Sequence, residues 1–274
     1  MTTRGDSTWR IEARSGTAAQ LHVQWPPLEW MHERVVAFSN VSHAAIVLGS
    51  SQSLKVSRYI ESNGGGWDNF SGCEDRGIEV VSRSTGGGAV YVAPADQLWV
   101  DFWLPKSDVL FDHDILRSSF WVGSIWVKAL KSFGLQDIKM HEGRLMLGEW
   151  GSLVCFASTG PGEVFCGTRK VLGISQRRTR HGIWFQTMLP LRWAPGEWIP
   201  CMTPYFKLFR EGELLSTVEL QAWLVEHVVS FDDLAWSQCS ASGLNGSDSS
   251  GGSGYSGGSA VRAIVDGLIA NLPT

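Results

Sequence analysis

Residues 97–104, with the sequence QLWVDFWL, restrict the fold more than any other segment of the chain. The run has the length of a strand and is almost wholly apolar, so both of its faces need cover from other parts of the protein. A strand of this kind predicts a sheet that is packed against other elements. Hydrophobic residues make up 43% of the chain and charged residues 18%, which is enough apolar surface for such a core.

Further short apolar runs predict more strands. They cover residues 44–48, 78–81, 89–92, 162–166, 169–175 and 183–191, with Gly167-Thr168 as a hairpin turn. Apolar residues at three- and four-residue spacing predict a helix over 112–133, capped by Asp112 or Asp114 and ended by Gly134. Ser216 and Glu219 have capping-box spacing, which predicts another helix towards Val229. The predicted fold class is α+β, with mixed β-sheets packed against helices.

Charge and hydropathy exclude several classes of protein. The 274 residues include 23 Lys+Arg and 27 Asp+Glu, giving a net charge of −4, which argues against nucleic-acid and polybasic membrane binders. We find no signal peptide near the N-terminus and no apolar run near the roughly 20 residues that a bilayer requires. Five widely spaced cysteines form no CxxC pair and fit reduced thiols. We therefore expect a soluble cytoplasmic protein with no nucleic-acid or membrane partner.

A Gly/Ser-rich tract near the C-terminus fits a flexible linker because it cannot bury a core. It matches two motifs by composition, GxGxxG at 252–257 and GxSxG at 254–258, but no strand-like run precedes either one. We therefore assign no function to them. Fourteen tryptophans elsewhere fit either a dense core or an aromatic-lined pocket.

The first chemical signal is the segment GIEVVSRSTGGGAVY at residues 77–91. One strand delivers Arg83 and two hydroxyls, and Gly86, Gly87 and Gly88 then lead into a second strand. Backbone without side chains lets N–H groups approach an anion or a carbonyl closely, and Arg83 adds a guanidinium for a phosphate or carboxylate. The alternative is a glycine-rich hairpin with a surface arginine.

The second signal is the segment GTRKVLGISQRRTRHG at residues 167–182. Lys170 lies in an otherwise apolar strand, where an unpaired ammonium is unfavourable, so we expect it to meet an anion. The alternative is that the cationic groups from Arg169 to Arg180 form a solvated hairpin tip.

These two segments together resemble the lipoate-protein ligase and octanoyltransferase family, a branch of the superfamily that includes biotin-protein ligases. The family patterns are RR-x-[ST]-GGG-A-V and G-R-K-x-x-G-x-[AS]-Q, and this chain has SRSTGGGAV and GTRKVLGISQRR. The resemblance implies an α/β catalytic domain whose mixed sheets and helices enclose an acyl-binding tunnel. It divides the chain into an N-terminal segment 1–20, a catalytic domain 21–237 with the motifs in 35–193, a linker 238–259 and a C-terminal helix 260–274.

The resemblance also assigns site residues. Lys170 is a catalytic residue, and Arg83 with Lys170 binds the acyl carboxylate or the acyl-adenylate phosphate. The remaining substrate-binding positions are Thr85, Gly86, Gly87, Gly88, Ala89, Gly173, Ile174, Ser175 and Gln176.

The leading expectation from this resemblance is a lipoate-protein ligase, and the family chemistry of ligases uses ATP and Mg²⁺ to activate lipoate or octanoate as an acyl-adenylate. The acyl group then passes to a lysine of an apo lipoyl domain, in a 2-oxoacid dehydrogenase or a glycine-cleavage carrier protein. The chain departs from the ligase pattern at Ser82, where the family has its first arginine, and at 92–94, where ligases often have His-Asp. The metal ligands stay unassigned.

A second type within the family uses no ATP and no cofactor. It takes octanoate from acyl carrier protein onto a cysteine, and Cys155-Phe156 resembles its CF-containing loop. Cys155 is thus a candidate nucleophile, with a small buried hydrophobe as the alternative, and Cys166 is a weaker candidate. A non-catalytic module that binds an acyl group or a carrier domain is the alternative of another class. The arginine-rich loop of biotin-protein ligases is absent.

Overall fold

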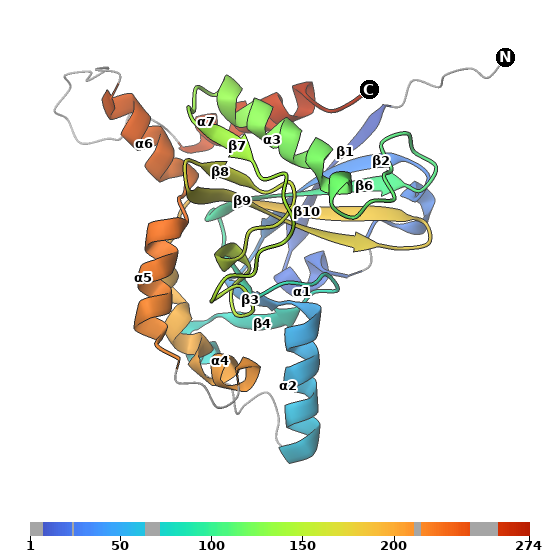
Figure 1. Cartoon of the computed structure of the whole chain (residues 1–274). Coiled ribbons are helices and arrows are strands. Elements are labelled where there is room, and N and C mark those ends of the chain that lie inside the picture. The colour runs from blue at the N-terminus through green and yellow to red at the C-terminus, as the bar shows by residue number, and fades with distance from the viewer. Residues whose placement is uncertain (1–7, 24, 64–71, 211–214, 242–256) are drawn as a thin grey trace.

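A computed structural model describes residues 8–23, 25–63, 72–210, 215–241 and 257–274. The larger of its two main sheets has seven strands, and Figure 1 shows them across the middle of the molecule. In spatial order they are β1 (Trp9–Gly16), β2 (Arg34–Val41), β6 (Gln97–Pro105), β10 (Gly182–Pro190), β9 (Arg169–Arg178), β8 (Val164–Cys166) and β7 (Ile138–Met140). Strands β1 and β2 pair in parallel, and the other neighbours are antiparallel.

The smaller sheet has the order β4-β3-β5. Strand β3 (Ala45–Leu48) lies parallel to β4 (Glu79–Ser82) and antiparallel to β5 (Val90–Val92). The glycine-rich segment joins β4 to β5. The two sheets make the fold mixed α+β, as the sequence predicts.

The helices lie on both sides of the larger sheet (Figure 1). Helices α3 (Phe120–Ser132) and α7 (Gly257–Ala270) cover one face, while the smaller sheet lies towards the other with α1 (Ala18–Leu21) and α2 (Ser50–Asn63). The remaining helices follow the sheets in sequence: α4 (Thr203–Phe209), α5 (Thr217–His227) and α6 (Phe231–Ala241). No described helix is long and apolar enough to cross a bilayer.

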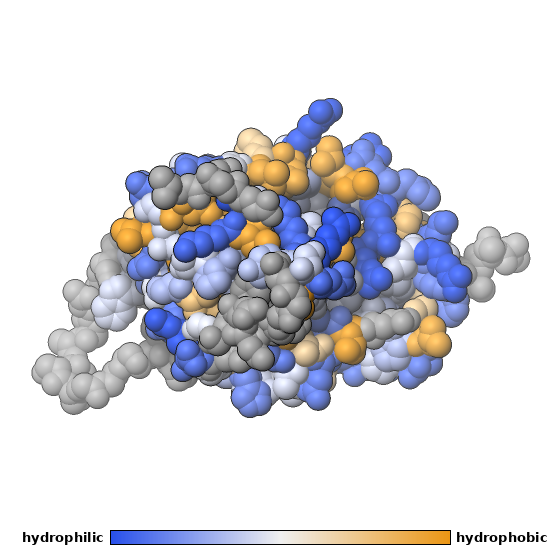
Figure 2. Space-filling model, turned by 90° about the horizontal axis from the view of Figure 1, so that it is seen from below, coloured by the Kyte–Doolittle hydropathy of each residue, from blue (hydrophilic) through white to orange (hydrophobic). Residues whose placement is uncertain are grey.

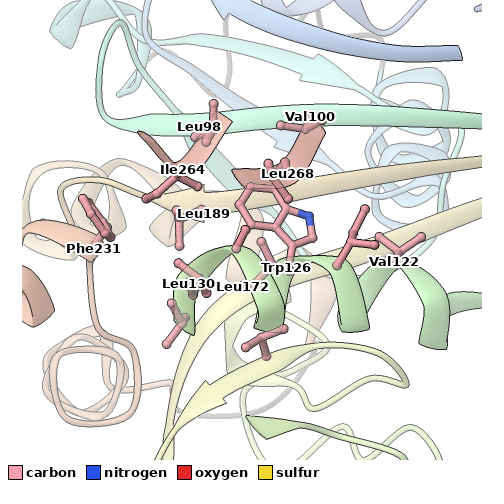
Figure 3. Packing of buried hydrophobic residues seen from close by; sticks show 14 of the residues in the cluster. Leu98, Val100, Val122, Trp126, Leu130, Leu172, Leu189, Phe231, Ile264 and Leu268 are labelled. Atoms are coloured by element: carbon pink, nitrogen blue, oxygen red, sulfur yellow. The ribbon is translucent and has the colours of Figure 1, made fainter. Parts of the chain in front are cut away.

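Strand β6 is buried along all nine of its residues, which confirms the prediction from its apolar sequence. Its even-numbered residues Leu98, Val100, Phe102 and Leu104 join a cluster with α3 and α7. Figure 3 shows Trp126 of α3 in this cluster, together with Leu98, Val100 and Leu268. The odd-numbered residues Trp99 and Trp103 join clusters on the opposite face, so the strand is covered on both sides as expected.

Local signals place several boundaries correctly. Asp114 Oδ1 accepts hydrogen bonds from the N–H groups of Leu116 and Arg117. Beyond the end of the helix, Gly134 has a φ of 107°, which takes the backbone out of the helical conformation. The regular α-helix starts later than predicted, at Phe120, because a 3₁₀ turn over Arg117–Ser119 precedes it.

The second predicted cap is also present. Ser216 Oγ accepts from Glu219 N–H and starts α5, which ends at His227 rather than at Val229. The predicted hairpin turn at Gly167 joins β8 to β9. Residues 9–16, which the sequence assigned to an N-terminal segment, form β1 of the larger sheet. The middle of the predicted linker, 242–256, lies outside the described residues, while its ends belong to α6 and α7.

The end of the molecule formed by α2 and α4 faces the viewer in Figure 2. Hydrophobic side chains form several separate patches there, between hydrophilic ones. The exposed apolar residues of the described chain include Leu54 of α2 and, in the loop before Cys155, Leu145, Met146 and Leu147.

Candidate active site

A pocket lies between the two sheets, with a volume of about 450 Å³ when its open mouth is included. Its lining is mostly apolar and comes from both sheets and from the segment around Cys155. The lining residues are His22, Val47, Arg83, Val90, Val92, Trp99, Cys155, Phe156, Gly173, Ile174, Ser175, Gln186, Thr187 and Met188. An apolar pocket with a few polar groups is the usual form of a small-molecule site.

The glycine-rich segment packs directly against the segment that bears Cys155. The Cys155 N–H donates to Ala89 O at 2.9 Å, and the Ala89 N–H donates to Leu153 O at 2.9 Å. A Cβ on Gly88 would lie 2.7 Å from backbone atoms of Val154, so only glycine permits this approach. The glycine-rich segment and the Cys155 segment, although about seventy residues apart in the sequence, therefore pack side by side at the pocket.

Arg83 organises the glycine-rich loop from inside. Its Nη2 donates to the carbonyl oxygens of Gly86 and Gly88, at 2.9 Å each. Its Nε is buried and has no hydrogen-bond partner among the described residues. A Cβ built on Gly87, which has a φ of 98°, would lie 3.1 Å from Arg83 Nη2 and 3.5 Å from Cys155 Sγ. The guanidinium and the thiol thus flank the same glycine.

Lys170 meets an anion, as its place in an apolar strand predicts. Its Nζ lies 2.7 Å from Glu163 Oε1, and both side chains are only 2% exposed. The ammonium also donates to the carbonyl oxygens of Cys155 and Ser158, at 3.2 and 2.8 Å. Glu163 accepts further hydrogen bonds from the backbone N–H groups of Gly160 and Ile174. Lys170 and Glu163 therefore hold the turn at Cys155 against strand β9.

A hydrogen-bonded chain crosses the pocket at its polar side. Thr85 Oγ1 donates to Gln186 Oε1 at 3.2 Å, so Ser175 Oγ is the donor in its 3.3 Å bond to Thr85. Gln186 Nε2 donates to His22 Nδ1 at 3.2 Å. The His22 proton then resides on Nε2. Burial, with the charges of Arg83 and Arg14, lowers the pKa of His22 to about 3, so the ring is neutral.

A sequence model of the lipoyl protein ligase A/B catalytic domain matches residues 32–195, more than half of the chain. This chain belongs to the lipoyl protein ligase A/B family. A comparison with curated proteins finds no match.

Solved structures of lipoate ligases share the fold of this family member. A T. acidophilum lipoate protein ligase with bound lipoic acid aligns with a TM-score of 0.53 at 14% identity, covering 96% of this chain and 85% of that one. A lipoate-protein ligase A bound with ATP aligns with a TM-score of 0.54 at 14% identity, with the same coverages. At this identity the likeness concerns the fold.

The structure places four of the family motif positions in the lining of the pocket. Arg83, Gly173, Ile174 and Ser175 line it, and Thr85 is bonded to lining residues. Gly86, Gly87, Gly88 and Ala89 form the loop described above.

Gln176 lies elsewhere, because alternate residues of a strand point to opposite faces. Its Nε2 donates to Ile115 O, and its Oε1 accepts from Ser118 Oγ, so it holds the segment before α3. Cys166 does not line the pocket; its Sγ lies 3.6 Å from Gln136 O, and burial raises its pKa.

The positions that depart from the ligase pattern have other contacts here. Ser82 Oγ lies 2.6 Å from Ser53 Oγ of helix α2, on the surface. Val92, in the place of the His-Asp pair, contributes an apolar wall to the pocket. The described residues contain no group of three or more His, Cys, Asp or Glu side chains that could hold a metal ion.

Several residues of the site were not predicted from the sequence. His22, Trp99 and Gln186 line the pocket, and Glu163 pairs with Lys170. Glu163 had a usable signal, since Lys170 requires an anion and Glu163 is a carboxylate seven residues before it. His22 lies between the apolar residues Leu21 and Val23 and had none.

Proposed function

We propose that this chain transfers a medium-length acyl group, octanoyl or lipoyl, to a lysine of a carrier domain through a thioester on Cys155. One observation carries this proposal: Cys155 lines the pocket of a lipoyl protein ligase A/B domain, beside Arg83 and the glycine-rich loop. Thiol nucleophiles at such sites split an acyl transfer into two easier steps.

In the first step the Cys155 thiolate attacks the carbonyl carbon of an acyl thioester. A bond forms between this carbon and Sγ, and the donor leaves as its own thiolate. In the second step the neutral amine of the acceptor lysine attacks the same carbon. Cys155 leaves as thiolate, the amine loses a proton to water or buffer, and an amide remains.

The residues around Cys155 support both steps. The backbone N–H groups of Gly87 and Gly88 donate to no acceptor among the described residues, which leaves them free to bind the oxyanion of each tetrahedral intermediate. Arg83 holds the Gly86 carbonyl, which shares a peptide plane with the Gly87 N–H and so fixes the direction of that N–H. Lys170 positions Cys155 by binding its carbonyl oxygen.

Two structures of relatives support a proposal for the partners. The T. acidophilum structures include one with bound lipoic acid and one of a bipartite ligase with its E2 lipoyl domain. We propose an apo lipoyl domain of a 2-oxoacid dehydrogenase or a glycine-cleavage carrier protein as acceptor, and acyl carrier protein as donor. The cytoplasm is the proposed compartment.

Adenylating lipoate ligation is the second candidate, and the unpartnered Nε of Arg83 favours it as a donor to a carboxylate or phosphate. ATP would fit this route, as in the ATP-bound relative. Mg²⁺ does not fit the residues present: no described residue lining the pocket is a carboxylate. Glu163 does not line the pocket, and both of its carboxylate oxygens already accept hydrogen bonds from Lys170, Gly160 and Ile174. We derive no step through a metal ion.

Intact-mass spectrometry of an apo lipoyl domain tests the proposal. The domain is incubated with the protein and either octanoyl-acyl carrier protein or lipoate with ATP and Mg²⁺. We expect a mass increase with the acyl carrier donor that Cys155→Ser abolishes and the control Cys166→Ser retains. An increase only with lipoate and ATP, unaffected by Cys155→Ser, would establish the ligase instead. Carrier binding without any mass change would indicate the non-catalytic module.

A further inference from the structure

Two buried cysteines that the proposed acyl transfer does not use meet in the core beside the smaller sheet. Cys73 directly precedes the 3₁₀ turn that leads to β4, and Cys201 lies in the 3₁₀ turn Ile199–Met202 that follows β10. Both belong to one hydrophobic cluster, and both are free thiols. We propose that Cys73 and Cys201 are a redox-sensitive pair, which a peroxide oxidises to a disulfide. This oxidation is independent of the proposed acyl transfer.

The two cysteines are 128 positions apart in the sequence but in direct contact. The Cys73 thiol donates to Cys201 O, with Sγ 3.3 Å from the oxygen, and it also hydrogen-bonds to the Cys201 thiol. The backbones approach each other as well, since a Cβ on Gly72 would lie 4.0 Å from Cys201 Cα. A bond between the two sulfurs is therefore within reach without a rearrangement of the fold.

The surroundings make Cys201 the thiol that reacts first. The hydrogen bond from Cys73, helped by the charge of Arg76, lowers the pKa of Cys201, although burial acts in the opposite direction. Cys201 is also the more accessible of the two, with 4% of its surface exposed against 0% for Cys73. Thiolate character and access to solvent are the properties that select a cysteine for oxidation. Cys73, in contact with it, is then the resolving thiol.

The oxidation takes two steps, and hydrogen peroxide supplies the oxidising equivalents. The Cys201 thiolate attacks one oxygen of the peroxide, the O–O bond breaks, and hydroxide leaves, so that Cys201 becomes a sulfenic acid. Cys73 Sγ then attacks the sulfur of the sulfenic acid. The hydroxyl group leaves with the Cys73 proton as water, and a disulfide remains. Together the two sulfurs lose two electrons, which reduce the peroxide.

A disulfide at this place fastens together two segments near the pocket. On one side, Ile78 N–H donates to Cys73 O at 3.0 Å, directly before β4. On the other side, the turn with Cys201 follows Trp198, whose ring stacks on Tyr91 of β5 with the planes inclined by 3°. Closing a chain segment as long as this one restricts the unfolded state strongly, so the oxidised protein should resist heat better than the reduced one.

Treatment of the purified full chain with hydrogen peroxide tests the proposal, followed by intact-mass spectrometry and a non-reducing peptide map. Wild type is compared with a variant in which Cys155, Cys166 and Cys239 are serine, so that the pair holds the remaining thiols. In both proteins we expect a peptide that links Cys73 to Cys201, which a thiol reductant cleaves. In the variant, the mass should fall by two hydrogen atoms and the melting temperature should rise by about 5–10 °C.

Single variants test the order of the two steps. Cys73→Ser should leave a sulfenic acid on Cys201 that dimedone traps, whereas Cys201→Ser should leave Cys73 without the label. Cys166→Ser is the matched control and should form the linked peptide as wild type does. Circular dichroism identifies the folded variants, and the peptide map of wild type decides the matter without them. A folded wild type that gives no link between Cys73 and Cys201, or links either of them to Cys155 or Cys166, would overturn the proposal.

Discussion

Two buried ion pairs lie next to the pocket, and they differ in how fully they are buried. Lys170 and Glu163 lie behind Cys155, with both side chains 2% exposed. Arg14 and Asp101 lie next to Leu21 and Trp99, with Asp101 fully buried and Arg14 partly exposed. Both oxygens of Glu163 meet an N–H donor, and the Lys170 ammonium also meets two carbonyl oxygens.

The Asp101 carboxylate also has several donors: Arg14, the indoles of Trp99 and Trp184, and Ser39. Burial nevertheless dominates and raises its pKa to about 6. Burial of the Asp101 carboxylate therefore outweighs its four donors. The Lys170–Glu163 pair fixes the position of the Cys155 carbonyl, and Asp101 titrates near neutral pH.

Breaking the Lys170–Glu163 ion pair should have the largest effect on stability. Lys170→Met leaves the Glu163 charge buried without its cation and releases the carbonyl of Cys155, so we expect the free energy of unfolding to fall by about 3–5 kcal/mol. Acyl transfer should be lost as well. Denaturant unfolding measures the first effect, with Lys139→Met of the surface pair Lys139–Asp137 as control. Equal stability of the two variants would contradict the structural role of Lys170.

His22 should have the next largest effect, which is on the pH dependence of stability. Its pKa in the folded protein, about 3, lies below the ordinary value, so the unfolded chain binds a proton first as the pH falls. Wild type should therefore lose about 3 kcal/mol of stability at this site between pH 7 and pH 4. His22→Gln should not show this loss. Denaturant unfolding at four pH values compares the two proteins, and parallel curves would show that His22 titrates normally.

Asp101 should act with the opposite sign. Because its folded pKa is raised, its contribution to stability is present at low pH and is lost as the pH rises through about 6. Asp101→Asn should remove this loss, a difference of about 2 kcal/mol between pH 4 and pH 7. The same unfolding series measures it. A wild-type curve that rises more steeply with pH than that of Asp101→Asn would refute the assignment.

Removing one weak donor should give the smallest effect. Ser39 Oγ donates to Asp101 Oδ2 at 3.3 Å, so Ser39→Ala should destabilise the ionised carboxylate by about 1 kcal/mol and raise its pKa further. The midpoint of the Asp101 titration, followed by NMR of the carboxyl carbon, should move above that of wild type. A midpoint that moves down would mean that Ser39 does not support the charge.

Much of the fold could be predicted from the sequence because buried strands are visible as runs of apolar residues. Strand β6 is the clearest case, since a run without polar alternation needs cover on both faces. Helix α2 could not be recognised in this way, because SSQSLKVSRYIESN has no continuous apolar stripe and few buried side chains. Strand β1 was missed for a related reason: it is an edge strand, and its alternate residues are exposed.

The sequence motifs indicated one side of the candidate site better than the other. Arg83 and Cys155 stand in motifs and line the pocket, and Lys170, also in a motif, lies behind Cys155 and bonds to its carbonyl oxygen. The two-residue period of a strand could have separated Ser175, which faces the pocket, from Gln176, which does not. His22 reaches the pocket only through the pairing of distant strands, and no local pattern records that contact.

The N-terminal strands β1 and β2 are hydrogen-bonded to the last described residues. Trp9 Nε1 and Arg34 Nη1 both donate to Pro273 O, at 2.9 and 2.8 Å. During synthesis, these two donors lack this partner until Pro273 has left the ribosome. Ile264 and Leu268 of α7, which join the main core, are also made long after strands β1 and β2. The nascent protein therefore keeps part of its core open to chaperones until α7 has been synthesised.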